Sequence, residues 1–289
     1  LGIALGGVFA MSSTAVLTKL LAERLQLDSA HGREIIGVLL FQDLAVVPLL
    51  VLIPSLTQPP ERLAMLLGVA LIKAVVVLAL ILVFGQKLMR KWFHFVARAK
   101  SSEVFVLNVL LITLSLATLT ELAGLSLALG AFVAGMLISE TEYRMQVEED
   151  IKSFRDVLMG LFFVTIGVKL DMHILLGLWW QVLLVLLGLL LVKSLIVGLL
   201  SWRLGSSPGN AIRSALWLCA GGEFGFVLLG EIARMPKATE QVVLTALVLS
   251  MLIAPFIVQY SEKLVMRFVA GEWLLRSMQL TKIAAESMG

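Results

Sequence analysis

Charged side chains are scarce in this chain, and cysteine is almost absent. Asp, Glu, Lys and Arg make up 15% of the 289 residues, whereas a soluble domain carries about 25%. This shortage, with 60% hydrophobic residues and a mean hydropathy of +1.00, excludes a soluble enzyme, a nucleic-acid-binding protein and a disordered chain. The single cysteine, Cys219, excludes an internal disulfide and a cysteine metal cage.

Motifs of enzymes and of nucleotide-binding proteins are also missing. The sequence contains no HExxH, GxSxG, P-loop or GxGxxG arrangement, which argues against a membrane-embedded enzyme and against a bound nucleotide. Its three histidines lack the spacing of metal ligands, so no metal site is expected. We therefore expect no cofactor within this chain.

Apolar runs of about twenty residues, the length that crosses roughly 30 Å of hydrocarbon, alternate with charged connections. We predict an all-α polytopic membrane protein, because an open structure in lipid satisfies its backbone groups only as helices. The fifth and sixth runs are short, so we expect them to pack inside the bundle or to be broken. The nine predicted spans cover residues 1–21, 34–54, 62–86, 103–122, 125–139, 157–170, 174–202, 211–233 and 241–262.

Lysine and arginine are distributed unequally between the connections. Most of them lie near residues 22–33, 86–102, 140–156 and 203–213 and after residue 262, which makes that face cytoplasmic by the positive-inside rule. We predict a transmembrane domain over 1–262 and a cytoplasmic exit helix or linker over 263–289. The chain opens with Leu1 inside an apolar run and without the basic segment of a signal peptide, so we expect it to be a piece of a longer membrane protein.

Three ionisable residues are predicted at one depth in the membrane. Asp43, Lys193 and Glu223 each stand ten residues from an arginine at the cytoplasmic edge, which places them about 15 Å deep at 1.5 Å per residue. A charge at the helix centre costs about 3 kcal/mol, so it usually has a partner or a functional role. We expect Asp43 and Lys193 to form an ion pair that opens when a cation binds, with Glu223 influencing the titration. The alternative is a structural pair that only fixes helix packing.

Glycine and serine interrupt two of the predicted spans near this depth. Paired broken helices are typical of a transport site, because unwound backbone and half-helix ends can face an ion. Small residues that allow close helix packing are the alternative explanation. The interruptions are Gly6-Gly7 and Ser12-Ser13-Thr14 in the first span, and Gly221, Gly222 and Gly225 in the eighth.

Asp43 is the residue expected to carry the ion. Its carboxylate can bind a proton or a monovalent cation, and burial and the charge of Lys193 act on that choice in opposite directions. Gln42 offers an uncharged oxygen, so the Gln42-Asp43 dipeptide contains one acid where some sites would contain two. The predicted ion-binding residues are Asp43, Gln42, Ser12, Ser13 and Thr14.

Several motifs, in this order, resemble those of bacterial Kef-type members of the second monovalent cation:proton antiporter family. The similarity extends over nearly the whole chain, and the ordered set is specific although each motif alone is weak. The motifs are SSTA at 12–15, the stretch from Gly32-Arg33 through LLFQDLAVVP at 39–48, LGAFVAG at 129–135, GLFFVTIG at 160–167 and GGEFGF at 221–226.

The resemblance implies a sodium/proton-antiporter-like fold with inverted repeats, two crossed broken helices and a mobile core domain that moves against a dimerisation domain. It also implies a homodimer in the bacterial inner membrane, with Asp43 as the ion-binding acid, Gln42 as its neighbour and Lys193 as the basic residue before the second broken helix. Family members usually carry further spans before the first one here and often a cytoplasmic nucleotide-binding regulatory domain after the last, so we expect both to be missing from this chain. Members with Gln-Asp at this position exchange potassium for protons, and relatives with paired acids tend to exchange sodium.

We therefore predict a secondary active transporter that exchanges K+ for H+ by alternating access. Sodium:proton exchange is the nearest alternative, and a cation channel or sensor subunit is a more distant one. Broken helices and a single titratable acid favour alternating access over a continuous pore.

Overall fold

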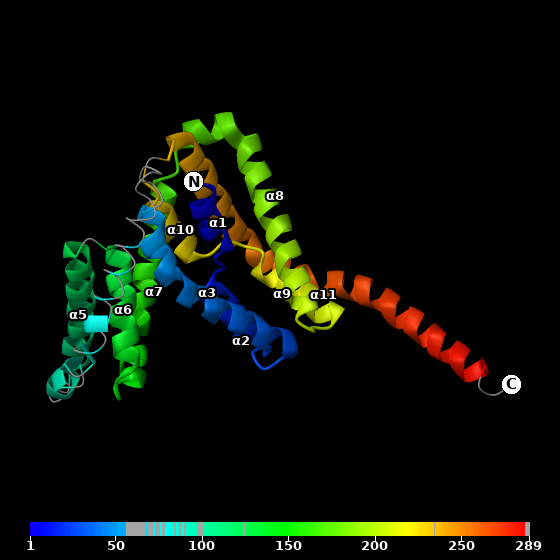
Figure 1. The fold of residues 1–289 in the computed structure, drawn as a ribbon, viewed down its shortest axis with the longest axis horizontal. Coiled ribbons are helices and arrows are strands. Elements are labelled where there is room, and N and C mark those ends of the chain that lie inside the picture. The colour runs from blue at the N-terminus through cyan, green and yellow to red at the C-terminus, as the bar shows by residue number, and fades with distance from the viewer. Residues whose placement is uncertain are drawn as a thin grey trace. The chain divides into compact units, whose positions relative to one another are not determined.

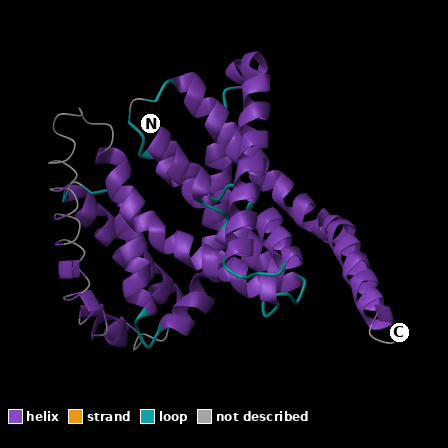
Figure 2. Cartoon of the chain, turned by 45° about the vertical axis from the view of Figure 1, so that its right-hand side comes forward, coloured by secondary structure: helices purple, strands orange, loops and turns teal. Residues whose placement is uncertain are grey.

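The computed structural model describes residues 1–55, 101–123, 125–233 and 235–286, together with scattered positions between 68 and 96. Within these residues the chain forms helices and loops, and no strand occurs (Figure 2). With the labels of Figure 1, the helices are α1 (Gly2–Ala10), α2 (Thr14–Glu23), α3 (Ala30–Ser55), α5 (Ser102–Leu122), α6 (Leu127–Ser139), α7 (Arg144–Val168), α8 (Met172–Arg203), α9 (Pro208–Leu218), α10 (Glu223–Gly230) and α11 (Lys237–Glu286).

The predicted all-α membrane fold is confirmed. Five of the described helical segments are long and apolar enough to cross a membrane, and the bent pair α9–α10 makes a sixth. Each predicted span other than the third coincides with a described helix or helix pair. The third, 62–86, lies mostly outside the described residues.

The two short predicted spans differ from each other. Helix α6 has 13 residues and buries about half of them, as expected for a helix inside the bundle. Helix α7 is instead continuous over 25 residues, and its buried residues are Val147 and Ile166. Its polar first half, Arg144 to Asp156, extends the helix before the apolar run because Arg, Glu, Lys and Gln are good helix formers. The expectation that this run is broken or enclosed is therefore wrong.

The last helix passes through the predicted domain boundary. Helix α11 runs without interruption from Lys237 to Glu286, so the predicted exit helix continues the last span. The division of the chain at residue 262 stays a prediction.

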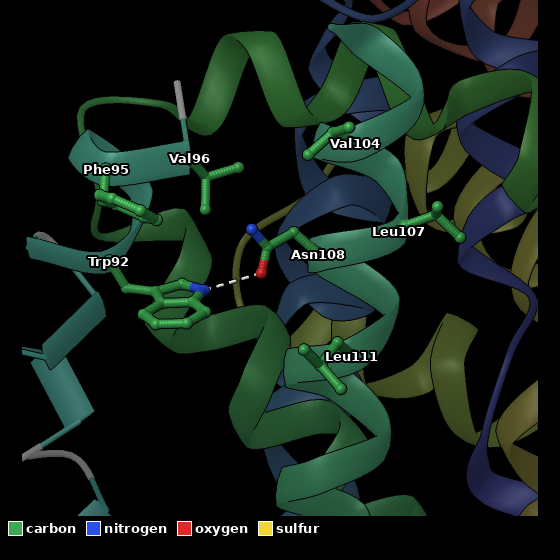
Figure 3. A pocket seen from close by; sticks show the side chains of 7 residues that line it. All are labelled: Trp92, Phe95, Val96, Val104, Leu107, Asn108 and Leu111. Carbon is green, nitrogen blue, oxygen red and sulfur yellow. Dashed lines mark hydrogen bonds between the residues drawn. The ribbon is translucent and has the colours of Figure 1, made fainter. Parts of the chain in front are cut away.

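Chain contacts divide the protein into two units. One contains Leu1, Val46–Met172 and Gly230–Met235, and the other contains Gly2–Ala45, His173–Leu229 and Pro236–Gly289. In the first unit α5 packs closely on α6 at Gly130. A Cβ at that position would overlap Thr120 and the backbone of Leu116, so the close contact requires glycine. Trp92 Nε1 in the same unit donates to Asn108 Oδ1 at 2.7 Å, beside an apolar pocket (Figure 3).

The second unit contains both interrupted helices, α1–α2 in blue and α9–α10 in yellow (Figure 1). Its core joins α2, α3, α9 and α11 through the buried side chains of Leu17, Leu21, Ile35, Leu39, Trp217, Leu218 and Val258. Arg24 donates to the carbonyl of Val258 at 3.3 Å and stands 5.9 Å from the Trp217 ring centroid. Arg213 and Glu262 link α9 to α11 with two contacts of 3.1 Å. These interactions fix the helices that flank the two interruptions relative to one another.

Candidate functional site

The first interruption lies between Ala10 and Thr14. Ser13 has extended backbone (φ −77°, ψ 104°), and its Oγ accepts a hydrogen bond from the N–H of Val16 at 3.3 Å, so it caps α2. Gly6 and Gly7 lie inside α1 and do not interrupt it, so that part of the prediction is wrong. A glycine weakens a helix by only about 1 kcal/mol relative to alanine, whereas a capping serine defines where a new helix starts.

The second interruption lies between Leu218 and Glu223, where α9 and α10 are bent by 50°. Gly221 lies in this break as predicted, and its N–H donates to the Oγ of Ser250 on α11 at 3.0 Å. Gly222 lies in the break as well. Gly225 is the third residue of α10, so its assignment to the break is wrong.

The two interruptions cross each other at backbone contact. A Cβ on Gly222 would overlap the carbonyl group of Ser12, and one on Gly225 would lie 3.0 Å from the carbonyl oxygen of Val8. The Oγ of Ser12 also donates to the carbonyl of Leu218 at 3.1 Å. The expected crossing of two broken helices is therefore confirmed, whereas the inverted repeats and the dimer stay predictions.

Lys193 of α8 binds the two helix ends that meet at this crossing. Its Nζ donates to the carbonyl oxygens of Met11 at 2.6 Å and Ala220 at 2.9 Å, and the residue is buried. These carbonyls follow the C-terminal ends of α1 and α9, where the helix dipoles are negative and carbonyls lack helical partners.

The predicted Lys193–Asp43 ion pair is not formed in this structure. The described ion pairs are Arg155–Asp156 and Arg213–Glu262, and the Lys193 ammonium is satisfied by backbone instead. The physical reason is that a helix interruption exposes carbonyl acceptors that the sequence does not display.

Lys193→Met is expected to lower the free energy of unfolding by about 2 kcal/mol, because it leaves two buried carbonyls without their donor. The fall would appear as a lower melting temperature of the purified protein in detergent. Lys19→Met is the matched control, since Lys19 is exposed on α2. Equal melting temperatures for the two variants would contradict the capping role of Lys193.

The Gln42-Asp43 dipeptide of α3 binds both sides of the first interruption. Gln42 Oε1 accepts from the N–H of Ser12 at 2.9 Å, and Asp43 Oδ1 accepts from the hydroxyl of Thr14 at 3.0 Å. The structure thus brings together four of the five predicted ion-binding residues. The oxygen of Gln42 already has a donor, so its contribution in this structure is to hold the unwound segment.

Glu223 reaches the same place from the other broken helix. Its Oε1 accepts from the N–H of Ala15 at 3.4 Å. The N-terminal ends of α2 and α10, which carry partial positive charge, lie at Thr14 and Glu223. Acids therefore occupy the positive helix ends of the crossing and Lys193 occupies the negative ones.

Sequence reasoning missed the backbone groups that complete this arrangement, namely the carbonyls of Met11, Leu218 and Ala220 and the N–H of Ala15. It also missed Ser250, whose hydroxyl holds Gly221. A serine within the apolar run 241–262 is the sequence signal that could have pointed to it.

Known proteins are similar to this chain over most of its length. The model of the family described as "Sodium/hydrogen exchanger, transmembrane" matches residues 1–260. The chain is 43% identical over 274 residues to the "Putative K(+) efflux antiporter KefB" of Alkalimonas amylolytica, covering 93% of this chain and 41% of that protein. It is 40% identical over 277 residues to K(+) efflux antiporter 1, chloroplastic, of Arabidopsis thaliana, covering 92% of this chain and 23% of that protein.

A third relative is the Glutathione-regulated potassium-efflux system protein KefC of Klebsiella pneumoniae, 36% identical over 237 residues, which are 82% of this chain and 38% of that protein. The chain thus spans less than half the length of these relatives. The sequence resemblance to Kef-type antiporters is confirmed. Because the family model covers most of the chain, this integral membrane protein belongs to the sodium/hydrogen exchanger transmembrane family.

Proposed function

We propose that the protein exchanges potassium for protons by alternating access, with Asp43 binding the cation or the proton in turn. The observation that carries the proposal is the position of Asp43, whose carboxylate accepts from Thr14 at the crossing of two interrupted helices and is not paired with Lys193. A carboxylate without a counterion in a membrane span needs a proton or a cation. Exchange between these two occupants is antiport.

Potassium is the preferred cation because three relatives are named as potassium-efflux proteins. Gln42 supports the same choice, because the resemblance to Kef-type antiporters implies that members with Gln-Asp at this position exchange potassium for protons. Sodium is the alternative, supported by the name of the matching family. We place the protein in a bacterial inner membrane as a homodimer, with a nucleotide-binding regulatory domain in the complete protein.

The test is cation-induced proton movement in proteoliposomes that contain the complete protein. We expect K+ to release trapped protons more effectively than Na+ across a pH series. A stronger response to Na+ would show that sodium and not potassium is the transported cation. Cation current without proton movement would show that the protein is a channel and not an antiporter.

Exchange is expected to be nearly insensitive to membrane potential. One site that holds either one proton or one monovalent cation moves no net charge, so a potential worth about 2.3 kcal/mol per charge per 100 mV does not act on the cycle. The measurement compares exchange rates at zero and at a large negative potential.

Gln42→Glu is the informative variant for this experiment. It keeps an oxygen for the N–H of Ser12 and adds a second acid to the dipeptide. We expect this variant to acquire a voltage dependence. A strong dependence in the unmodified protein would contradict the one-for-one exchange.

A further inference from the structure

Glu223 has a carboxylate oxygen that nothing in the described part of the chain binds. Its Oε1 accepts from the N–H of Ala15, whereas its Oε2 is buried and has no hydrogen-bond partner. A buried polar atom without a partner costs a few kcal/mol, and an ionised one costs more. Such an atom in a native structure calls for a ligand or a proton.

The location of this oxygen indicates which ligand. Thr14 and Ala15 are consecutive in the first turn of α2, and they donate to Asp43 and Glu223 respectively. The two acids come from α3 and α10 and therefore meet at one helix N-terminus. Two ionised carboxylates that accept from adjacent residues of one helical turn repel each other, which favours a cation or a proton between them.

Among the residues that the structure describes, the other groups around the pair do not satisfy this requirement. Lys193 of α8 donates to the carbonyls of Met11 and Ala220. The thiol of Cys219, which lies in the interruption between α9 and α10, donates to the carbonyl of Leu216 at 3.0 Å. From α11, Leu247 and Ser250 face this break at Gly221, and neither is ionisable in the working pH range. No side-chain cation in the described part of the chain joins Asp43 and Glu223, so a cation from solution would fill this position.

We propose that Glu223 is the second acid of the transport site and that its Oε2 is a ligand of the bound potassium ion. This inference rests on the function proposed above. Without the cation the two carboxylates share one proton, and when K+ binds between them that proton leaves. The pair carries one negative charge with either occupant, so one K+ replaces one H+ and the exchange stays electroneutral. Gln42, whose oxygen holds Ser12, is a positioning residue in this arrangement.

Glu223→Gln tests the assignment in proteoliposomes of the complete protein. The amide keeps an oxygen for the N–H of Ala15 but cannot be an anionic ligand, so the KM for K+ is expected to rise about 10- to 100-fold, the scale of a lost charged interaction. The pH optimum should also move to lower pH, because a single carboxylate releases its proton more readily than two that share it. Glu231→Gln is the matched control, because Glu231 follows the opposite end of α10.

The outcomes separate the two levels of the proposal. If the unmodified protein shows no cation-driven proton movement, the proposed function fails. If it does and Glu223→Gln has an unchanged KM and pH optimum, Glu223 is not a ligand and this inference is overturned.

A binding measurement covers the case in which Glu223→Gln does not fold. K+ should raise the melting temperature of the unmodified protein and of Glu231→Gln relative to choline, by mass action on the folded state. Glu223→Asp keeps the acid on a shorter side chain, so it should retain the pH optimum while its KM for K+ rises. An unchanged KM in Glu223→Asp would count against the ligand role.

Discussion

Asp43→Asn is expected to abolish exchange while leaving the protein folded and inserted. The amide oxygen can still accept a hydrogen bond from the hydroxyl of Thr14, so the contact between α3 and the first interruption is kept. The amide has no charge to neutralise a cation and cannot bind and release a proton near neutral pH. Cation-driven proton movement in proteoliposomes should fall to the level of empty vesicles.

The same change at an exposed aspartate provides the control. Asp28→Asn alters the turn between α2 and α3, outside the crossing, and should exchange normally. The melting temperatures of both variants should stay near that of the unmodified protein. Proton movement at the normal rate in Asp43→Asn would remove Asp43 from the mechanism and, with it, the proposed function.

Helix positions followed from the sequence because they depend on a local quantity, the length of an apolar run. The apolar run length set the spans, and counting residues from the cytoplasmic arginines placed Asp43 and Glu223 at similar depths. The structure agrees to the extent that both acids bind the first turn of α2. Motif order added the crossing of broken helices, which hydropathy alone does not imply.

Partner choice could not be predicted in the same way. The sequence suggested that Lys193 pairs with Asp43 because opposite charges at one depth attract. In the structure its ammonium donates to carbonyls at the ends of α1 and α9. Those carbonyls are free to accept only because the helices end there. Every residue has a backbone carbonyl, so no residue type in the sequence indicates which of them will be acceptors.

The role of a glycine was equally hidden. Gly6 and Gly222 looked alike in the sequence, as small residues in apolar spans. Gly6 lies in a continuous helix with nothing within 4 Å of a Cβ, whereas Gly222 contacts the backbone of Ser12. The difference arises because Ser12, about 210 residues away in the chain, packs against Gly222. This contact belongs to the tertiary structure and cannot be seen in the local sequence.

Gly222→Ala is consequently expected to have a large effect on both stability and transport. A methyl group at this position would overlap the carbonyl group of Ser12, and backbone cannot move aside as a flexible side chain can. Overpacking of this kind costs about 3 kcal/mol. The separation of the two interruptions would also disturb the bonds from Ser12 to Gln42 and to the carbonyl of Leu218. We expect a lower melting temperature in detergent and loss of exchange in the protein that still folds.

Gly6→Ala is the matched control, because it adds the same methyl group to the first broken helix where a Cβ meets no neighbour. Alanine favours a helix interior over glycine by about 0.5–1 kcal/mol, so this variant should be as stable as the unmodified protein or slightly more stable, and active. If Gly222→Ala behaves like Gly6→Ala in both measurements, the two interruptions do not touch at Ser12 in the functional protein. The shared site for Asp43 and Glu223 would then lose its structural basis, since Glu223 reaches α2 from the helix that begins at that crossing.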